Sequence, residues 1–508
     1  MRLLVCLFLL VAPVAADVEL AGIFGDGMVL QRGARVPIWG RAEPGESVTI
    51  AFAGQEVTAV ADDLGRWQAR LEPMDAIIDR ELIVRGANVI KLQRVCVGEV
   101  WLCSGQSNMA WPVRASKDAE REIAAASDRW LRLLTVPHKV SAEPVDDLRG
   151  RWHETDSKTV ANFSAVAYYF GRQLRMRLDV PVGLIHASWG GTPAEAWTSA
   201  EALRDMPAMK PTLQRWVQIL EAWPARKLQF DAELEKWKRQ AARAKKAKER
   251  PPRRPRPPLG PDSPHGPSVL FNGMIAPLVP YGIKGVIWYQ GESNAGRADQ
   301  YRTLFPGMIH DWRRRFEQGD FPFLFVQLAN FRKRADFPGE SAWAELREAQ
   351  RLTLEVPATG MAVAIDIGEA ADIHPKDKQE VGRRLSLWAL SGAYGYPSVL
   401  YTGPLFAKAQ RRGKKFRIEF DHVGDGLKTA DDLNLRGFAI AGKDRTWLWA
   451  LAEIKEGRVE VWHPKVRVPA AVRYCWGDNP DGNLVNSAGL PASPFRTDDW
   501  PWTTAGKG

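Results

Sequence analysis

The sequence has few cysteines and lacks the common metal-binding motifs. Four cysteines occur among 508 residues, and the first of them, Cys6, lies in an apolar N-terminal segment. The other three cannot all pair with one another, which argues against a disulfide scaffold. No CxxC pair and no HExxH motif occurs, so the sequence gives no support for a zinc site. We therefore expect neither a metal nor any other cofactor.

Long hydrophobic runs are also missing after the first residues. No later stretch approaches the ~20 apolar residues that cross a bilayer, so we expect no membrane span. The one apolar run, from Leu3 to Val14, follows the positive charge of Arg2 and precedes the small residues Ala15 and Ala16. This order is typical of a secretory signal peptide. The sequence thus predicts a signal peptide over residues 1–16 and a secreted or periplasmic protein.

Acidic residues are scarce in one segment only. Residues 236–256 contain eleven Lys or Arg and a single acid, Glu249, so this segment accounts for the whole net charge of +10. The remainder of the chain is neutral, which does not suggest a nucleic-acid-binding protein. The basic segment is either a solvated helix that runs into a proline-rich linker or an arm with weak affinity for polyanions. Its proline-rich end is not expected to adopt one compact conformation.

Hydrophobic patterning divides the mature chain into three parts. Short alternating runs separated by turn residues predict a β-sandwich-like module over residues 17–95. Continuous apolar runs that alternate with helical segments predict an α/β domain with a parallel sheet over 96–398. A charged, proline-rich insertion interrupts this domain at about 200–265. Alternation returns over 399–508 and predicts a second β module.

Polar clusters follow the apolar runs of the central domain, at the sheet edge where ligands of α/β proteins bind. Ser107 lies in one of them, two residues after Gly105, at a strand-to-helix turn that would expose its hydroxyl. His374 lies in another, two residues after Asp372, which could orient its ring. Two further clusters carry backbone or amide donors for an oxyanion: Trp189–Thr192 and Gln290–Asn294.

These clusters resemble the sequence blocks of the sialate O-acetylesterase family, which belongs to the SGNH or GDSL-like hydrolase superfamily. The similar stretches are Trp101–Met109, Ser188–Thr192, Ile287–Asn294 and Asp372–Lys376, with further similarity at 267–277, 472–474 and 490–496. The resemblance implies a three-layer α/β/α flavodoxin-like hydrolase domain with a parallel sheet, flanked by β-sandwich-like modules. It also implies hydrolysis of O-acetyl esters on a glycan substrate.

Carried over by position, the resemblance gives roles to individual residues. Ser107 would be the nucleophile, His374 the base and Asp372 the acid that orients it. The N–H groups of Ser107 and Gly191, with a side-chain amide, would form the oxyanion hole. The superfamily's usual Gly-x-Asn-Asp block reads Gly291-Glu-Ser-Asn here, so the amide could come from Asn294 or from Gln290.

Other functions stay open at this point. The sugar could be a sialic acid, or the acetylated unit of a polysaccharide such as xylan. A protein of another class, a non-catalytic glycan-binding protein on a hydrolase scaffold, would have lost Ser, His or Asp from the blocks, whereas all three are present. Four tryptophans beside the clusters either contact a sugar or belong to the core: Trp111, Trp189, Trp197 and Trp288.

Overall fold

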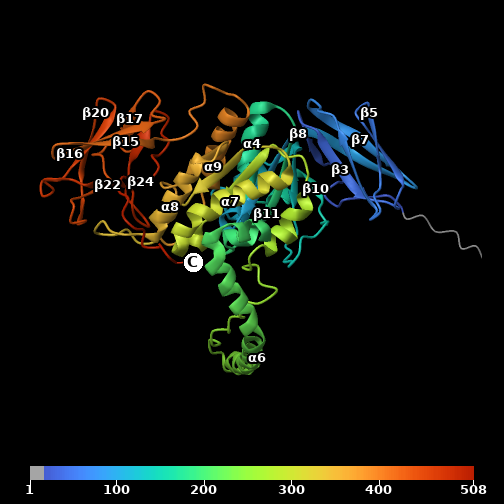
Figure 1. Cartoon of the computed structure of the whole chain (residues 1–508), viewed down its shortest axis with the longest axis horizontal. Coiled ribbons are helices and arrows are strands. Elements are labelled where there is room, and N and C mark those ends of the chain that lie inside the picture. The colour runs from blue at the N-terminus through green and yellow to red at the C-terminus, as the bar shows by residue number, and fades with distance from the viewer. Residues whose placement is uncertain (1–16, 508) are drawn as a thin grey trace, which may run out of the picture.

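The computed structural model describes residues 17–507, so the predicted signal peptide lies outside the described residues. A central α/β body carries one β module on each side, the N-terminal one and the C-terminal one, and a long helix projects from its lower face (Figure 1). Within the described residues, no helix is both long and apolar enough to cross a membrane. Nor do these residues include a group of three or more His, Cys, Asp or Glu side chains placed to hold a metal ion.

The N-terminal module is made of short strands that are antiparallel except where β2 pairs in parallel with β8. In one sheet β3 (Val36–Arg41) lies between β1 (Glu19–Leu20) and β6 (Arg66–Leu71). Every second side chain of β6 is buried, as expected for strands with one face on a core. In the other sheet β7 (Ile77–Arg85) pairs with β8 and with β4 (Ser47–Phe52), and β4 pairs with β5 (Gln55–Val60), while β2 (Val29–Gln31) pairs with the middle of β8.

One long strand joins this module to the central body. Strand β8 runs from Val89 to Gly105, and its first half pairs with β7. Its second half is buried and enters the central sheet, where it pairs in parallel with β11 and β12. The expected boundary between residues 95 and 96 falls inside this continuous strand. Cys96 and Cys103 lie in it as buried free thiols.

The central sheet confirms the predicted α/β class. Its strand order is β10-β9-β11-β8-β12-β13-β14, parallel except at the β10 edge. Strands β11, β12 and β13 are buried along their whole length, which explains their continuous apolar sequences. The strand bounds are β9 (Ser127–Thr135), β10 (Trp152–Asp156), β11 (Val182–Ser188), β12 (Gly285–Tyr289), β13 (Phe323–Gln327) and β14 (Thr359–Val363).

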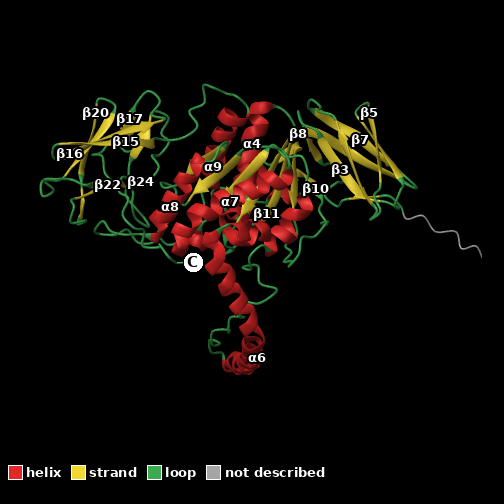
Figure 2. Cartoon of the chain, in the orientation of Figure 1, coloured by secondary structure: helices red, strands yellow, loops and turns green. Residues whose placement is uncertain are grey.

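Helices surround this sheet, as Figure 2 shows. Helix α4 packs against α9, and α7 packs against α8. The larger helices are α4 (Ala165–Leu178), α7 (Ala298–Phe316), α8 (Ala342–Leu352) and α9 (Lys378–Trp388). Short helices connect them: α1 (Ser107–Ala110), α2 (Ala119–Ala124), α3 (Ser157–Val160) and α5 (Ala200–Asp205). Because β8, β11, β12 and β14 run in the same direction, the loops after them meet at one edge of the sheet.

The insertion forms an arm in which a helix and an extended segment pack together. Helix α6 (Lys210–Ala247) projects from the body, and the proline-rich chain returns along it (Figure 1). Three tryptophans spaced by multiples of seven lie on one side of the helix. Gly266 packs on Trp216, Gly260 packs on Trp223, and Trp237 Nε1 donates to Pro252 O at 2.8 Å. The expectation that this segment has no compact conformation is therefore wrong, because the tryptophans hold the return segment against the helix.

The C-terminal module is a set of small antiparallel sheets, as predicted. One sheet contains β15 (Leu405–Arg412), β16 (Lys415–Asp421), β21 (Arg458–Trp462) and β20 (Leu451–Lys455). Another contains β19 (Trp447–Trp449), β18 (Phe438–Ala441), β22 (Ala471–Tyr474) and β24 (Phe495–Arg496). A two-stranded sheet pairs β17 (Leu427–Thr429) with β23 (Leu484–Asn486).

Candidate active site

Ser107 lies at a tight turn between strand β8 and helix α1. Gly105 ends the strand with φ +138°, a backbone conformation that side chains disfavour. A Cβ at Gly105 would lie 2.2 Å from the carbonyl oxygen of Tyr289 on the neighbouring strand. Gln106 N donates to that same oxygen at 2.9 Å. The turn therefore requires glycine at 105, and it places Ser107 as the first residue of α1.

Ser107, His374 and Asp372 form a hydrogen-bonded chain. His374 Nε2 lies 2.9 Å from Ser107 Oγ, and His374 Nδ1 lies 3.1 Å from Asp372 Oδ1. The same carboxylate oxygen accepts from His374 N at 2.9 Å, and this backbone hydrogen bond is the main reason that the pKa of Asp372 is lowered. The indole of Trp111 stacks on the His374 ring at 4.8 Å. The imidazole is thus held between a carboxylate, an aromatic face and the serine hydroxyl.

The loop that carries His374 is anchored by the C-terminal module. Gly368 N donates to Asn330 Oδ1 at 2.7 Å, and Arg332 N donates to Ala370 O at 3.0 Å. Asn330 Nδ2 in turn donates to Asn479 Oδ1 at 2.8 Å. Module loop 476–481 is therefore connected through two hydrogen bonds to the start of the histidine loop.

Gly190 and Gly191 lie beside the serine on the neighbouring strand end. Trp189 N donates to Gly105 O at 3.1 Å, which joins the ends of β11 and β8. A Cβ at Gly190 would lie 3.3 Å from the Cβ of Ser107. Gly191 has φ +78°, and the direction of its missing side chain is open. Glycine at 190 allows the backbone to approach Ser107 closely, and glycine at 191 allows the left-handed backbone conformation that follows.

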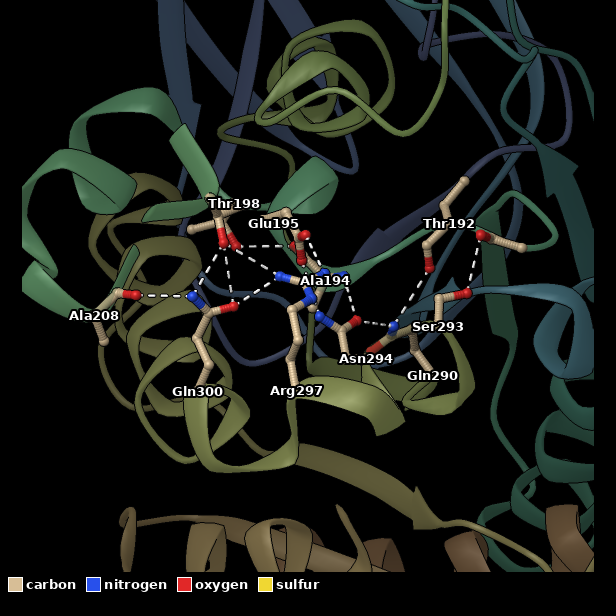
Figure 3. Close-up of polar contacts among 12 residues, drawn as sticks. Thr192, Ala194, Glu195, Thr198, Ala208, Gln290, Ser293, Asn294, Arg297 and Gln300 are labelled. Atoms are coloured by element: carbon tan, nitrogen blue, oxygen red, sulfur yellow. Dashed lines mark hydrogen bonds and ion pairs between the residues drawn. The ribbon is translucent and has the colours of Figure 1, made fainter. Parts of the chain in front are cut away.

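Gln290 and Asn294 belong to a buried polar network that holds the chain after Gly191 (Figure 3). Gln290 Nε2 donates to Asn294 Oδ1 at 2.7 Å and to Thr192 O at 3.3 Å. Asn294 Oδ1 also accepts from Ala194 N at 2.9 Å, while its Nδ2 donates to Glu195 Oε2 at 2.9 Å. Both amides therefore fix the loop that contains Gly191. Their role as direct oxyanion donors stays a prediction. The contacts above use both amide hydrogens of Gln290 but only one amide hydrogen of Asn294.

The predicted sugar-facing tryptophans divide into two pairs. Trp197 and Trp288 are fully buried and belong to the core. Trp111 and Trp189 are partly exposed, and each stacks on a histidine, Trp111 on His374 and Trp189 on His138. The Trp189 and His138 rings are 4.0 Å apart and nearly parallel. Only the second pair can contact a substrate without rearrangement of the core.

The sequence analysis missed a second polar network beneath the serine. Asn108 Nδ2 donates to Glu292 Oε1 and to Ile373 O, the carbonyl next to His374. Lys378 Nζ, fully buried at the start of α9, donates to Asn108 Oδ1. The network thus ties the residue after Ser107 to the residue before His374. A lysine two residues beyond the histidine block gives no sequence signal of such burial, because most lysines are exposed.

Burial dominates the electrostatics of this network. It lowers the pKa of Lys378 to about 7, against the opposing negative charge of Glu292, and it raises the pKa of Glu292. An unfolded lysine holds its proton up to ~10.4. Between these values the unfolded chain binds more protons than the folded one, so this lysine makes the free energy of unfolding rise with pH.

We therefore expect Lys378→Met to remove a pH-dependent part of the stability. Urea unfolding of both proteins at several pH values between 7 and 9.5 measures it. The free energy of unfolding of the wild type, minus that of the variant, should increase as the pH rises through this range. A difference that stays constant with pH would contradict the burial of an ionisable lysine at this position.

Comparisons with known proteins agree with this geometry. Residues 271–389 match the family described as carbohydrate esterase, sialic acid-specific acetylesterase. The chain is 32% identical to human (Homo sapiens) sialate O-acetylesterase over 94% of this chain and 91% of that protein. It is 33% identical to the Mus musculus sialate O-acetylesterase over 77% and 76% of the two chains. The crystal structure of a carbohydrate acetylesterase from Xanthomonas citri superposes with a TM-score of 0.82 and 37% identity, over 95% of this chain and all of that one.

Fold, site and relatives together define a carboxylic ester hydrolase. More specifically, the chain belongs to the sialate O-acetylesterase family.

Proposed function

We propose that this protein is a serine-type carbohydrate esterase that removes O-acetyl groups from glycans. The observation that carries the proposal is the contact of 2.9 Å between His374 Nε2 and Ser107 Oγ, continued by the contact of 3.1 Å with Asp372. A serine, a base and an orienting carboxylate at these distances are the groups that acyl transfer needs. A non-catalytic glycan-binding protein would have no need to keep all three.

In the proposed mechanism Ser107 Oγ attacks the acetyl carbonyl while His374 Nε2 takes the hydroxyl proton. Asp372, ionised because its pKa is lowered, stabilises the imidazolium. The N–H groups of Ser107 and Gly191 donate hydrogen bonds to the oxyanion. The side-chain amide of Asn294 or Gln290 either donates to the oxyanion as well or holds the loop that contains Gly191. His374 then returns the proton to the departing sugar oxygen, and water, deprotonated by the same imidazole, releases acetate from the serine.

The strand order supports the expected flavodoxin-like hydrolase architecture. Five of the six parallel strands follow the order β11-β8-β12-β13-β14, which reads 2-1-3-4-5 in chain order when β9, the parallel neighbour of β11 on its outer side, is left out. Flavodoxin-like sheets have this order, and their ligands bind where the order reverses. The reversal lies at β8, the strand that ends at Gly105 before Ser107. With the two helix pairs, α4 with α9 and α7 with α8, the arrangement fits a three-layer domain. We also propose that residues 1–16 direct export.

Release of acetate from acetylated sialic acids, xylans and pectins tests the proposed function. The relatives are named for sialate and, more broadly, for carbohydrate acetyl esters. We expect the wild-type protein to release acetate from at least one of these glycans. Failure on all of them, by a protein that is folded, would contradict the proposal.

The basic tip of the arm should be dispensable for catalysis. Trp237 donates a hydrogen bond to Pro252 across the arm, so helix α6 and the return segment lie side by side there. Residues 236–256 can therefore be replaced by a short turn. The change lowers the net charge from +10 to zero, since this segment carries all of it. Turnover of 4-nitrophenyl acetate should stay within about threefold, because loop closure costs change slowly with length.

A heparin column compares the shortened protein with the wild type. We propose that the tip gives the protein a weak, salt-sensitive affinity for polyanions, so the shortened protein should elute at lower salt. Loss of small-ester turnover in a shortened protein that still folds would show that the tip belongs to the active site.

A further inference from the structure

We infer that a cavity of about 360 Å³ at the foot of the arm binds the sugar part of the substrate, with Trp216 as its stacking surface. This inference rests on the proposed function and names the place where the glycan is recognised. Helix α6, the return segment and the loops after β11 and β12 all contribute to its lining. Sites for small ligands typically have such a mixed apolar and polar lining and a volume of roughly 300–1,000 Å³.

The cavity begins next to the serine. Gly191 lines it, and the neighbouring Gly190 is close enough that its Cβ would lie 3.3 Å from the Cβ of Ser107. Ser293, also in the lining, donates from Oγ to Gly191 O at 2.9 Å (Figure 3). An acetyl group at Ser107 would therefore place the rest of its ester within reach of this cavity.

The lining offers what a pyranose ring needs. Trp216 and Ile219, from the first turns of α6, give it an aromatic and an apolar surface. Trp216 is partly exposed, and an aromatic face packs against the C–H face of a sugar. Beside the first turn of the helix, Arg297 and Glu195 supply charged groups for hydroxyls, and they are joined to each other by an ion pair of 2.6 Å.

The foot of the arm is fixed to the hydrolase body by the network of Figure 3. Gln300 Nε2 donates to Ala208 O at 2.8 Å, just before α6, and to Thr212 Oγ1 at 3.0 Å in its first turn. Arg297 donates to Thr212 Oγ1 and to Glu195, which follows the Gly191 loop. The helix that carries Trp216 is thus held by the same side chains that hold the loop beside the serine.

Trp216 itself is held in one orientation by the return segment. A Cβ at Gly266 would lie 2.7 Å from the indole, so the glycine backbone lies against the ring. Trp223, seven residues further along the helix, has the same relation to Gly260 but is not part of the cavity lining. The chain therefore offers a matched pair: both tryptophans hold the arm together, and one of them faces the cavity.

The test compares Trp216→Ala, Trp216→Phe and Trp223→Ala. The substrates are O-acetylated N-acetylneuraminic acid, acetylated xylo-oligosaccharides and 4-nitrophenyl acetate, which has no sugar. For the sugar ester that the wild type hydrolyses best, we expect Trp216→Ala to lower kcat/KM about tenfold relative to its kcat/KM for 4-nitrophenyl acetate. Trp216→Phe should keep most of this ratio, and Trp223→Ala should leave it unchanged.

An unchanged ratio in Trp216→Ala, or an equal loss in Trp223→Ala, would overturn the inference. The second result would mean that a loosened arm, and not the cavity, changes the activity. Calorimetry with deacetylated xylo-oligosaccharides and N-acetylneuraminic acid gives a readout that needs no chemistry. If the Ser107→Ala protein binds one of these sugars and the double variant Ser107→Ala/Trp216→Ala does not, the result supports the cavity even if ester hydrolysis fails. If the double variant still binds the sugar, the inference about the cavity is overturned, and the proposed esterase function is not affected.

Discussion

Ser107→Ala should lower ester hydrolysis by about 10³-fold or more, to the weak level that binding and oxyanion contacts alone can give. The substitution removes one oxygen from the first residue of α1, so the turn at Gly105 and the hydrogen bond from Gln106 to Tyr289 are unaffected. The variant should therefore unfold at nearly the same temperature as the wild type. Rates of acetate release and thermal unfolding measure both effects.

Ser157→Ala is the matched control for this variant. Ser157 also lies just after a strand and also begins a four-residue helix, but it is exposed and lies after β10 at the edge of the sheet. It should retain wild-type activity. A Ser107→Ala protein that is folded and still releases acetate at the wild-type rate would show that the nucleophile lies elsewhere.

His374→Ala has the second largest expected effect, a loss of about 10³-fold in kcat, because the serine loses its base. Activity of the wild type should also fall when acid protonates the imidazole, since only the neutral ring can accept the serine proton. Asp372 does not cause this fall. Its pKa is lowered, mainly by the backbone hydrogen bond from His374, so it stays ionised in mildly acidic solution.

Two other histidines act as controls. His463 lies just after β21 in the C-terminal module, and His463→Ala should keep both the rate and the pH profile. His186 is buried in β11 beside Ser188, and burial lowers its pKa to about 4, so it is neutral throughout the active range. His186→Ala should reduce stability more than kcat in the remaining folded protein. Equal losses of kcat in all three variants would contradict the special role of His374.

The parts of the structure that depend on local pattern could be predicted from the sequence. Buried strands such as β12 and β13 are apolar throughout, and the polar residues after β8, β11 and β12 reveal which strand ends meet. The sequence blocks led to Ser107, Asp372 and His374, which the structure brings within hydrogen-bonding distance. These features are encoded within a few neighbouring residues.

Features that depend on distant contacts could not be predicted. Strand β8 continues through residues 95 and 96 because the N-terminal module and the central sheet both pair with it, and no turn residue interrupts it there. The return segment of the arm is ordered by glycines that meet tryptophans more than thirty residues earlier. The burial of Lys378 depends on its bond to Asn108, a contact across 270 positions. Composition and spacing carry no sign of such partners.

Covalent labelling of the serine tests the central claim most directly. A fluorophosphonate reacts with an activated serine by forming an oxygen–phosphorus bond and releasing fluoride, and the added mass can be located by peptide mapping. We predict one adduct, on Ser107, which forms rapidly. Acetate release should be lost at the same rate as the adduct forms. The Ser107→Ala protein should form no such adduct, and the His374→Ala protein should form it much more slowly. Complete loss of activity with an adduct on another residue, or an unlabelled Ser107 in a protein that still releases acetate, would contradict the account.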